Sequence, residues 1–194
     1  MNNKNKLGIA LISDFYYPNQ GGVEIHIHEL ARLLSDKYRI IVITHQRDNY
    51  VGRMEIGGIT IYYLEIAYIK SLSMSYPTFI LNFMRIKSIT ERENIQIFHC
   101  HQSCSPLSLE CLFFAKILKV KSILTEHSLV GFSNISDIHY NIIFQILLPP
   151  CEKIIAVSRT TRNNIILRAN LNPQQVTVIP NGVKKPSIKH KIKS

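Results

Sequence analysis

The sequence LGIALISDFYYPNQGGVEIHIHELARLL, residues 7–34, decides the fold class. Its first six residues form a short apolar run, which is typical of a parallel strand buried on both faces. A loop containing Pro18 follows and ends at Gly21 and Gly22, and apolar residues then recur at helical spacing. The order of strand, glycine loop and helix predicts an α/β fold in which the first helix begins at the two glycines.

The glycine pair is a candidate phosphate site. A helix that begins at Gly21 and Gly22 presents unpaired backbone N–H groups and the positive end of its dipole, and the missing side chains let an anion approach closely. Residues 7–34 contain no G-x-G-x-x-G motif and no Walker lysine, so they predict neither a dinucleotide fingerprint nor a P-loop. A tight turn without a ligand stays the alternative.

The rest of the chain alternates between the two kinds of element. The pattern predicts strands at residues 39–44, 59–64, 95–100, 121–125, 153–157 and 176–179. It predicts helices at residues 76–89 and 107–118, within 129–150, and from a cap at Ser158 to about residue 168. Residues 45–58 are expected to form a polar loop. This alternation predicts a doubly wound, mostly parallel Rossmann-like sheet, whose ligands bind beyond the carboxyl ends of the strands.

Length and charge bound the domain organisation. A chain of 194 residues that is 46% hydrophobic supports one substantial α/β core, assigned to residues 1–183. The formal net charge is +10, but lysines at 184, 185, 189, 191 and 193 supply half of it. Residues 184–194 are therefore expected to be a basic, disordered tail. Nucleic acid is not expected as a partner, because the rest of the chain is only moderately basic and shows no aromatic and basic platform.

Cysteine usage and hydropathy indicate the redox state of the compartment and whether the chain crosses a membrane. The four cysteines lie in apolar surroundings, which favours a reducing compartment. The longest apolar stretches, such as residues 142–150, are well short of the ~20 residues that span a bilayer, so no transmembrane helix is expected in these residues. The amphipathic 76–89 segment carries Arg85 and Lys87 on its polar side. Packing against the sheet is the expected role of its apolar side, and docking on an acidic membrane surface is the alternative.

Three predicted strands end in polar or ionisable residues. Ser13 and Asp14 follow the first strand, His101 follows the strand at 95–100, and Glu126 and His127 follow the strand at 121–125. Parallel strands bring these ends to one edge of the sheet. Their convergence there predicts a site at that edge.

His127 is the leading candidate for chemistry, because it directly follows a strand and a neighbouring Glu126 could fix its orientation. A satisfied structural histidine is the alternative. A metal site built from His99, His101, Cys100 and Cys104 is not expected, because no second ligand pair at zinc-like spacing appears and Cys100 would point away from the histidines. The chain has no G-x-S-x-G elbow, so no Ser/His/Asp triad is predicted.

Several segments, in order, resemble one known family. They are SDFYYPNQGGVEIHIHEL, VITH, FHCHQSCSPLSLECLFFAK, LTEHSLVGFSN, VSRTTRNNIILRANLNP and VTVIPNGV. Together they are similar to the amino-terminal domain of the catalytic subunits of phosphatidylinositol N-acetylglucosaminyltransferases, and the match runs from about residue 8 to residue 183. The combination of PNxGGVExH and TxHSLxGF is more specific than a generic Rossmann-like pattern. One difference is Glu126, where the family has aspartate.

The resemblance implies a retaining GT-B glycosyltransferase. Such an enzyme transfers N-acetylglucosamine from UDP-N-acetylglucosamine (UDP-GlcNAc) to phosphatidylinositol in the first step of GPI-anchor biosynthesis. It works within a multi-subunit complex on the cytoplasmic face of the endoplasmic reticulum membrane. By the same resemblance His127 is the catalytic residue beside the reacting sugar, and no metal or other cofactor is expected. The implied substrate and phosphate contacts are Gly21, Gly22, Glu24, His101, Glu126 and Ser128.

The match ends at residues 180–183, and the donor-binding domain of the family lies beyond it. The sequence therefore predicts an acceptor-side half that is inactive alone, either as a truncated product or as the partner of a separately encoded carboxyl-terminal half. The alternative is a noncatalytic module that binds a membrane or a complex partner through the 76–89 helix and the basic tail.

Overall fold

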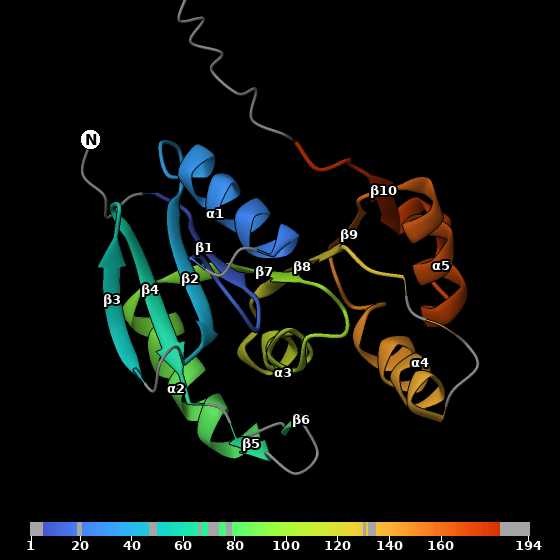
Figure 1. Ribbon diagram of the computed structural model, residues 1–194, viewed down its shortest axis with the longest axis horizontal. Helices are drawn as coiled ribbons and strands as arrows, with labels where there is room; N and C mark the ends of the chain where they lie inside the picture. The colour runs from blue at the N-terminus through green and yellow to red at the C-terminus, as the bar shows by residue number, and fades with distance from the viewer. Residues whose placement is uncertain are drawn as a thin grey trace, which may run out of the picture.

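The computed structural model describes residues 6–18, 21–46, 50–65, 67–69, 74–76, 79–129, 131 and 135–182. Its centre is an eight-stranded sheet with the strand order β10-β9-β8-β7-β1-β2-β4-β3, in which every neighbouring pair is parallel except β3 with β4 (Figure 1). The strands are β1 (Gly8–Ile12), β2 (Arg39–His45), β3 (Gly52–Ile56), β4 (Ile59–Leu64), β7 (Ile95–His101), β8 (Lys121–Glu126), β9 (Lys153–Ala156) and β10 (Val176–Val178). The mostly parallel, doubly wound Rossmann-like fold is confirmed.

The helices cover the two faces of the sheet unequally. They are α1 (Gly22–Leu34), α2 (Phe79–Arg92), α3 (Pro106–Leu118), α4 (Ile135–Leu147) and α5 (Arg159–Ala169), with a short 3-10 helix at Pro173–Gln175. Of the five helices in the described residues, α1 is the one that packs on one face, where Ile27 and Ala31 meet Leu11 and Val42. The other four helices contribute to the core on the opposite face (Figure 1). This division leaves α1 as the helix beside the functional edge described below.

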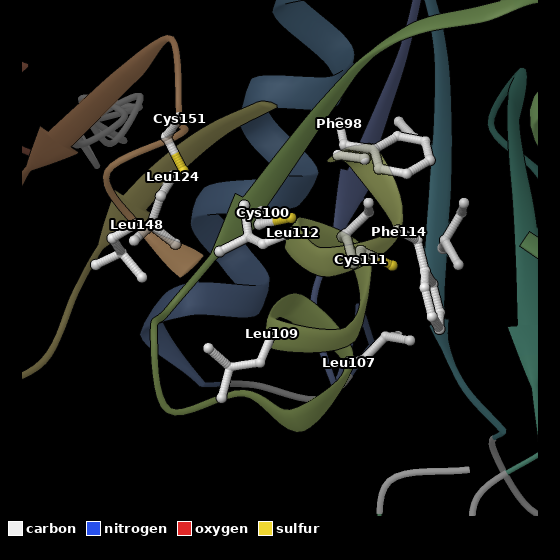
Figure 2. Packing of buried hydrophobic residues seen from close by; sticks show 14 of the residues in the cluster. Phe98, Cys100, Leu107, Leu109, Cys111, Leu112, Phe114, Leu124, Leu148 and Cys151 are labelled. Carbon is white, nitrogen blue, oxygen red and sulfur yellow. The ribbon is translucent and has the colours of Figure 1, made fainter. Parts of the chain in front are cut away.

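The larger core lies between the sheet and helices α2 to α5. Phe98 and Cys100 of β7 and Leu124 of β8 lie in one core cluster with residues of α3, and Leu124 lies beside Leu148 and Cys151 (Figure 2). The α3 residues of this cluster are Leu107, Leu109, Cys111, Leu112 and Phe114. The strands alternate, so the residues of β7 between these core positions face α1 instead. That alternation carries His99 and His101 to the α1 side, and Cys100 points away from them as the sequence predicts.

Two of the helices that start at the carboxyl edge of the sheet have a side-chain cap, and α1 has none. Ser105 accepts a hydrogen bond from the backbone N–H of Ser108 at the start of α3, and Ser158 does the same for Thr161 at the start of α5. The residue before α1 is Gly21, and no side chain makes a cap hydrogen bond there. Among these three helices, α1 is therefore the one whose first N–H groups lack a side-chain cap.

Two parts of the chain differ from the sequence prediction. Residues 52–56, predicted as loop, form the edge strand β3, which pairs antiparallel with β4 through a two-residue turn at Gly57 and Gly58. Both glycines have positive φ, 59° and 79°, as a type I′ hairpin turn requires. Helix α2 begins at Phe79 rather than at residue 76, because Met74–Tyr76 is the strand β6, paired with β5 (Ala67–Ile69).

Helix α2 packs on the sheet through Ile86 and Ile89, which are buried, so the packing role predicted for its apolar side is confirmed. None of the helices in the described ranges combines the length and the apolar character needed to cross a bilayer. The predicted tail, residues 184–194, lies outside the described residues, and the proposed boundary at residue 183 stays a prediction.

Candidate functional site

Three histidines from three elements meet at the carboxyl edge of the sheet. His101 ends β7, His127 directly follows β8, and His26 lies in the second turn of α1. Nδ1 of His101 and Nε2 of His127 are 3.2 Å apart and share a hydrogen bond. The ring centroid of His26 is 5.0 Å from that of His127 and 5.7 Å from that of His101. Neighbouring parallel strands therefore bring His101 and His127 together, as predicted, and α1 adds a third imidazole.

A fourth imidazole supports this cluster from within the sheet. The ring of His99 stacks on that of His101, with centroids 4.4 Å apart, and Nε2 of His99 lies 2.7 Å from Oγ1 of Thr125. His101 itself is fully buried at 0% exposure, whereas His26 and His127 are partly exposed. The two partly exposed rings can face a ligand, and His101 lies behind them.

The Glu126 side chain organises the loops around the site. It is 1% exposed, and its two oxygens accept hydrogen bonds from the backbone N–H groups of Ser103 at 3.1 Å and Ser128 at 3.0 Å. It thus joins the loop after β7 to the loop after β8. The carboxylate is enclosed and both of its oxygens are engaged, and the predicted contact of Glu126 with a substrate stays a prediction. Its role is to hold the segment that carries His127.

Ser128 is tied to the same pair of loops. Its hydroxyl oxygen accepts a hydrogen bond from the side-chain amide of Gln102 at 3.0 Å. Gln102 follows β7 with a positive φ of 68°, and its backbone N–H donates to the carbonyl of Thr125 at 2.8 Å. Ser128 is partly exposed, so the predicted contact with a substrate stays a prediction.

Burial keeps the histidine cluster neutral. Burial lowers the pKa of His127 to about 4, and repulsion by His26 adds to this shift. Burial also lowers the pKa of His26. Burial also lowers the pKa of His99 to about 4 and that of His101 well below its usual value, with the neighbouring histidines adding to both shifts. At neutral pH these imidazoles therefore act through hydrogen bonds and lone pairs rather than through positive charge.

The start of α1 lies at the same edge, one helical turn before His26. An added Cβ at Gly22 would meet nothing within 4 Å, so the space beside this glycine is open. At Gly21 the neighbouring group is the carboxylate of Glu24, which folds back over the helix start. An anion that binds there must displace this carboxylate, because the two negative charges would occupy the same end of the helix dipole. The phosphate-binding roles of Gly21, Gly22 and Glu24 stay predictions.

The segment between β1 and α1 is pinned on both sides. Asp14 accepts a hydrogen bond from the backbone N–H of Leu107, which ties this segment to α3. The Tyr16 hydroxyl and Nδ1 of His28 are 3.0 Å apart, and the ring of Tyr17 stacks on that of His28 with centroids 4.4 Å apart. Asp14, predicted as a site residue of the edge, is therefore part of the scaffold.

A surface groove of about 1210 Å³ runs along α1 from this edge. Gly22 and His26 line it at the end nearest the cluster, and Ile179, Pro180 and Asn181 line its other wall. The groove connects the open glycine and the partly exposed imidazole in one space. A ligand that occupies it can contact both.

His26 is the site residue that sequence reasoning missed. It lies within the stretch used to place α1, but apolar periodicity marks the buried positions of a helix and not those that face a neighbouring strand end. The available signal was its position four residues after Gly22, which places both on one face of the helix.

Solved structures identify the class of fold. The chain superposes on sucrose-phosphate synthase from Thermosynechococcus elongatus with a TM-score of 0.69 and 19% identity, covering 92% of this chain and 49% of that one. It superposes on a glycosyltransferase from Rickettsia africae with a TM-score of 0.62 and 20% identity, covering 92% and 44%. The fold is therefore that of the Rossmann-like domain of GT-B glycosyltransferases.

Sequence comparison then gives the family. Residues 20–185 match the model of Glycosyltransferase Family 4, and the chain belongs to that family. It is 37% identical over 177 residues to a subunit of phosphatidylinositol N-acetylglucosaminyltransferase from Homo sapiens, and 37% identical over 180 residues to the corresponding protein of Arabidopsis thaliana. These matches cover 90% and 92% of the chain but only 36% and 40% of the relatives. The resemblance found in the sequence is confirmed, and the chain spans well under half the length of these relatives.

Proposed function

We propose that this chain is the acceptor-side half of a retaining glycosyltransferase that transfers N-acetylglucosamine from UDP-GlcNAc to phosphatidylinositol, the first step of GPI-anchor biosynthesis. The observation that carries the proposal is the meeting of the uncapped α1 start with His26 and His127 at one edge of the sheet. The names of the relatives support the choice of donor sugar and acceptor lipid.

In the proposed site the start of α1 attracts the charged phosphate, and His127 contributes a hydrogen bond. Because the imidazoles are neutral, the attraction for a phosphate comes from the N–H groups and dipole at the start of α1, once the Glu24 carboxylate has moved aside. This phosphate belongs to the lipid headgroup or to the nucleotide leaving group. His127 donates or accepts a hydrogen bond at a sugar hydroxyl next to the reacting carbon, and so favours the developing oxocarbenium-like state.

No enzymic nucleophile is required for this reaction. In a front-face transfer the departing phosphate oxygen accepts the proton of the attacking inositol hydroxyl, which retains the configuration at the sugar. The transfer as proposed also uses no metal or other cofactor. The chain supplies binding, orientation and a shielded edge, and the donor is held by a carboxyl-terminal half.

The proposed setting follows the relatives. They are named as subunits of a transferase, so the partners proposed are other subunits of the GPI-GlcNAc transferase complex, together with phosphatidylinositol at a membrane surface and possible pairing with a separate carboxyl-terminal half. The proposed location is the cytoplasmic face of the endoplasmic reticulum membrane, with peripheral attachment of these residues.

A chimera tests the proposal in cells. Residues 1–182 replace the matching part of the Saccharomyces cerevisiae relative, to which the chain is 36% identical, in a strain that lacks the native protein. The chimera is expected to restore transfer of radiolabelled N-acetylglucosamine to phosphatidylinositol in membranes. The purified 194-residue chain alone is expected to show no transfer. A folded, well-expressed chimera without activity, or robust transfer by the isolated chain, would overturn the proposal.

Variants of the chimera test the site itself. His127→Ala is expected to lower transfer at least about 100-fold, in the range for loss of a positioned proton-transfer or hydrogen-bonding group. Gly22→Ala is expected to lower transfer while the protein stays folded, because the new methyl group enters open space where the anion binds. His139→Ala on the exposed side of α4 is the matched control and should retain parental activity. Unchanged transfer in His127→Ala would remove this residue from the mechanism.

A second candidate is a noncatalytic module that binds a membrane. The observation favouring it is a stripe on α4, where Ile138, Ile142 and Ile146 are 52%, 53% and 63% exposed at successive helical turns. The surface differs from the one predicted, because α2 uses its apolar side in the core. Flotation with phosphatidylinositol vesicles tests it. Binding lost in Ile142→Ser together with a transfer-inactive chimera would favour this function over the first.

A further inference from the structure

The histidine cluster has the composition and spacing of a metal site. His26, His101 and His127 each offer one ring nitrogen, and these three atoms all lie within 4.8 Å of one another. They come from α1, β7 and the loop after β8, so the tertiary fold creates the arrangement. Three histidines with a remaining open position form one of the common ligand sets of zinc.

The distance between the two central nitrogens suits either a hydrogen bond or a shared ion. Nδ1 of His101 and Nε2 of His127 are 3.2 Å apart. Two ligands at Zn–N distances of about 2.0–2.1 Å in a tetrahedral site are separated by about 3.3 Å. The pair is therefore at coordinating separation, and the nitrogen that donates the present hydrogen bond must first transfer its proton to the other nitrogen of its ring before both can bind an ion. His26 lies on the partly exposed side of the cluster, where rotation of its ring can bring the third nitrogen closer.

The surroundings of the cluster favour a cation that binds neutral nitrogen ligands. With Nδ1 of His101 as the ligand atom, its Nε2 carries the ring proton and is buried without a hydrogen-bond partner within the described residues. The Glu126 carboxylate, which directly precedes His127, accepts hydrogen bonds from two backbone N–H groups. A neutral imidazole set selects zinc, copper, nickel or cobalt over magnesium or calcium, which prefer oxygen ligands.

We propose that His26, His101 and His127 bind one divalent transition-metal cation of the zinc class, with its fourth position open to the groove beside α1. His26 lines that groove, so the open position is reached from the same space as Gly22. An anionic oxygen or a water fills the fourth position. The proposed transfer uses His127 without a metal, so a bound cation and the transfer compete for this imidazole, and cation binding can be measured without any transfer.

Cobalt binding tests the proposal with a direct spectroscopic signal. The purified 194-residue chain, free of a histidine tag, is titrated with Co²⁺ while visible absorption is recorded, and Zn²⁺ is then added as a competitor. One Co²⁺ per chain is expected, with the intense visible bands of a tetrahedral site that disappear when Zn²⁺ displaces it. Absence of these bands, or weak binding of several ions without them, would overturn the proposal.

Ligand variants identify the residues. His26→Gln and His127→Gln are each expected to weaken Co²⁺ binding at least about tenfold. Residues that only support a metal ligand typically cost about 10–100-fold in metal affinity when changed, and a ligand itself should cost no less. His139→Gln, at an exposed position of α4 outside the cluster, is the matched control and should bind like the parent. Thermal unfolding of each apo variant shows whether it is folded. Parental affinity in folded His26→Gln and His127→Gln would overturn the assignment, as would an equal loss in His139→Gln.

Discussion

Asp14 Oδ1 accepts a hydrogen bond from the backbone N–H of Leu107, 93 positions away, at 3.1 Å. The contact joins the end of β1 to the first turn of α3, and it places a carboxylate where water is largely excluded. Burial raises the pKa of Asp14 to about 6 from its ordinary 3.8, against the opposing effect of hydrogen bonds from Leu107 and Ser105. Nδ1 of His45 lies 3.4 Å from the same carboxylate.

The Asp14 carboxyl makes stability depend on pH. Its folded pKa lies above the unfolded one, so the folded state binds more protons between about pH 4 and 6, and this contribution to stability is lost as pH rises through 6. A shift of about two units corresponds to roughly 3 kcal/mol. Asp14→Asn keeps an acceptor for Leu107 and removes the titration. The variant should gain up to about 3 kcal/mol relative to the parent between pH 4 and pH 8, measured by urea unfolding.

His45 also titrates in this pH range, and its effect on stability must be separated from that of Asp14. Burial lowers its pKa to about 4, so its contribution to stability has the opposite sign, present above pH 6.5 and lost as pH falls through 4. At neutral pH His45 is uncharged, and where His45 becomes charged the Asp14 carboxyl is already protonated, so the two groups form no ion pair at either pH. Both proteins carry His45, so the part of its titration that does not depend on Asp14 cancels in the difference between parent and Asp14→Asn. A difference that stays constant from pH 4 to 8 would contradict the assignment to Asp14.

Removing the Glu126 carboxylate should destabilise the fold. Glu126→Ala leaves the N–H groups of Ser103 and Ser128 without their acceptor, and each buried unsatisfied donor costs about 1–3 kcal/mol. The expected loss in the free energy of unfolding is about 2–5 kcal/mol, measured by urea titration. Glu91→Ala, on the exposed side of α2, should change it by less than about 0.5 kcal/mol. Equal effects of the two changes would contradict the bridging role of Glu126.

Two glycines should respond in opposite ways to the same substitution. A Cβ at Gly8 would collide with the backbone carbonyl of Asn94, which cannot move aside like a side chain. Gly8→Ala should therefore destabilise the protein by about 1–3 kcal/mol, as overpacking does. Gly22→Ala places a methyl group in open space at the start of α1 and should add up to about 1 kcal/mol. Thermal unfolding of both variants checks the prediction, and a stable Gly8→Ala protein would be inconsistent with the close approach.

The cap of α5 can be tested in isolation. Ser158 accepts a hydrogen bond from the backbone N–H of Thr161 at 3.0 Å, and Ser158→Ala should cost about 1 kcal/mol of stability. Ser88→Ala, at an exposed position within α2, serves as the reference and should be neutral or slightly stabilising because alanine favours helix. Chemical unfolding distinguishes the two. A Ser158→Ala protein as stable as Ser88→Ala would show that the cap contributes nothing.

The sequence predicts the central sheet well because its strands are buried on both faces. Continuous apolar runs such as residues 9–12 and 40–43 have few alternatives to a central parallel strand. Strand β3 was missed for the opposite reason: residues 52–56 lie at an exposed edge, include Arg53 and Glu55, and carry no apolar run. The paired Gly57 and Gly58 were the readable sign of its hairpin.

The site was predictable where strand ends alone define it. His101 and His127 meet because β7 and β8 are parallel neighbours, and alternation along β7 directs Cys100 away from them. Two features required the fold. The contact of His26 with this pair depends on how α1 packs across the sheet. The burial of Glu126 depends on where β8 ends, because Glu126 is its last residue and not the first residue of the following loop.

The charged outer strand β3 has a consequence for self-association. Its exposed Arg53 and Glu55 border a row of backbone groups that pairs with β4 on one side only. A strand of another molecule that paired with β3 would have to remove water from both charged side chains. Natural proteins discourage edge-to-edge association in this way. The molecule can therefore keep a largely apolar sheet in solution without offering this edge as a template for aggregation.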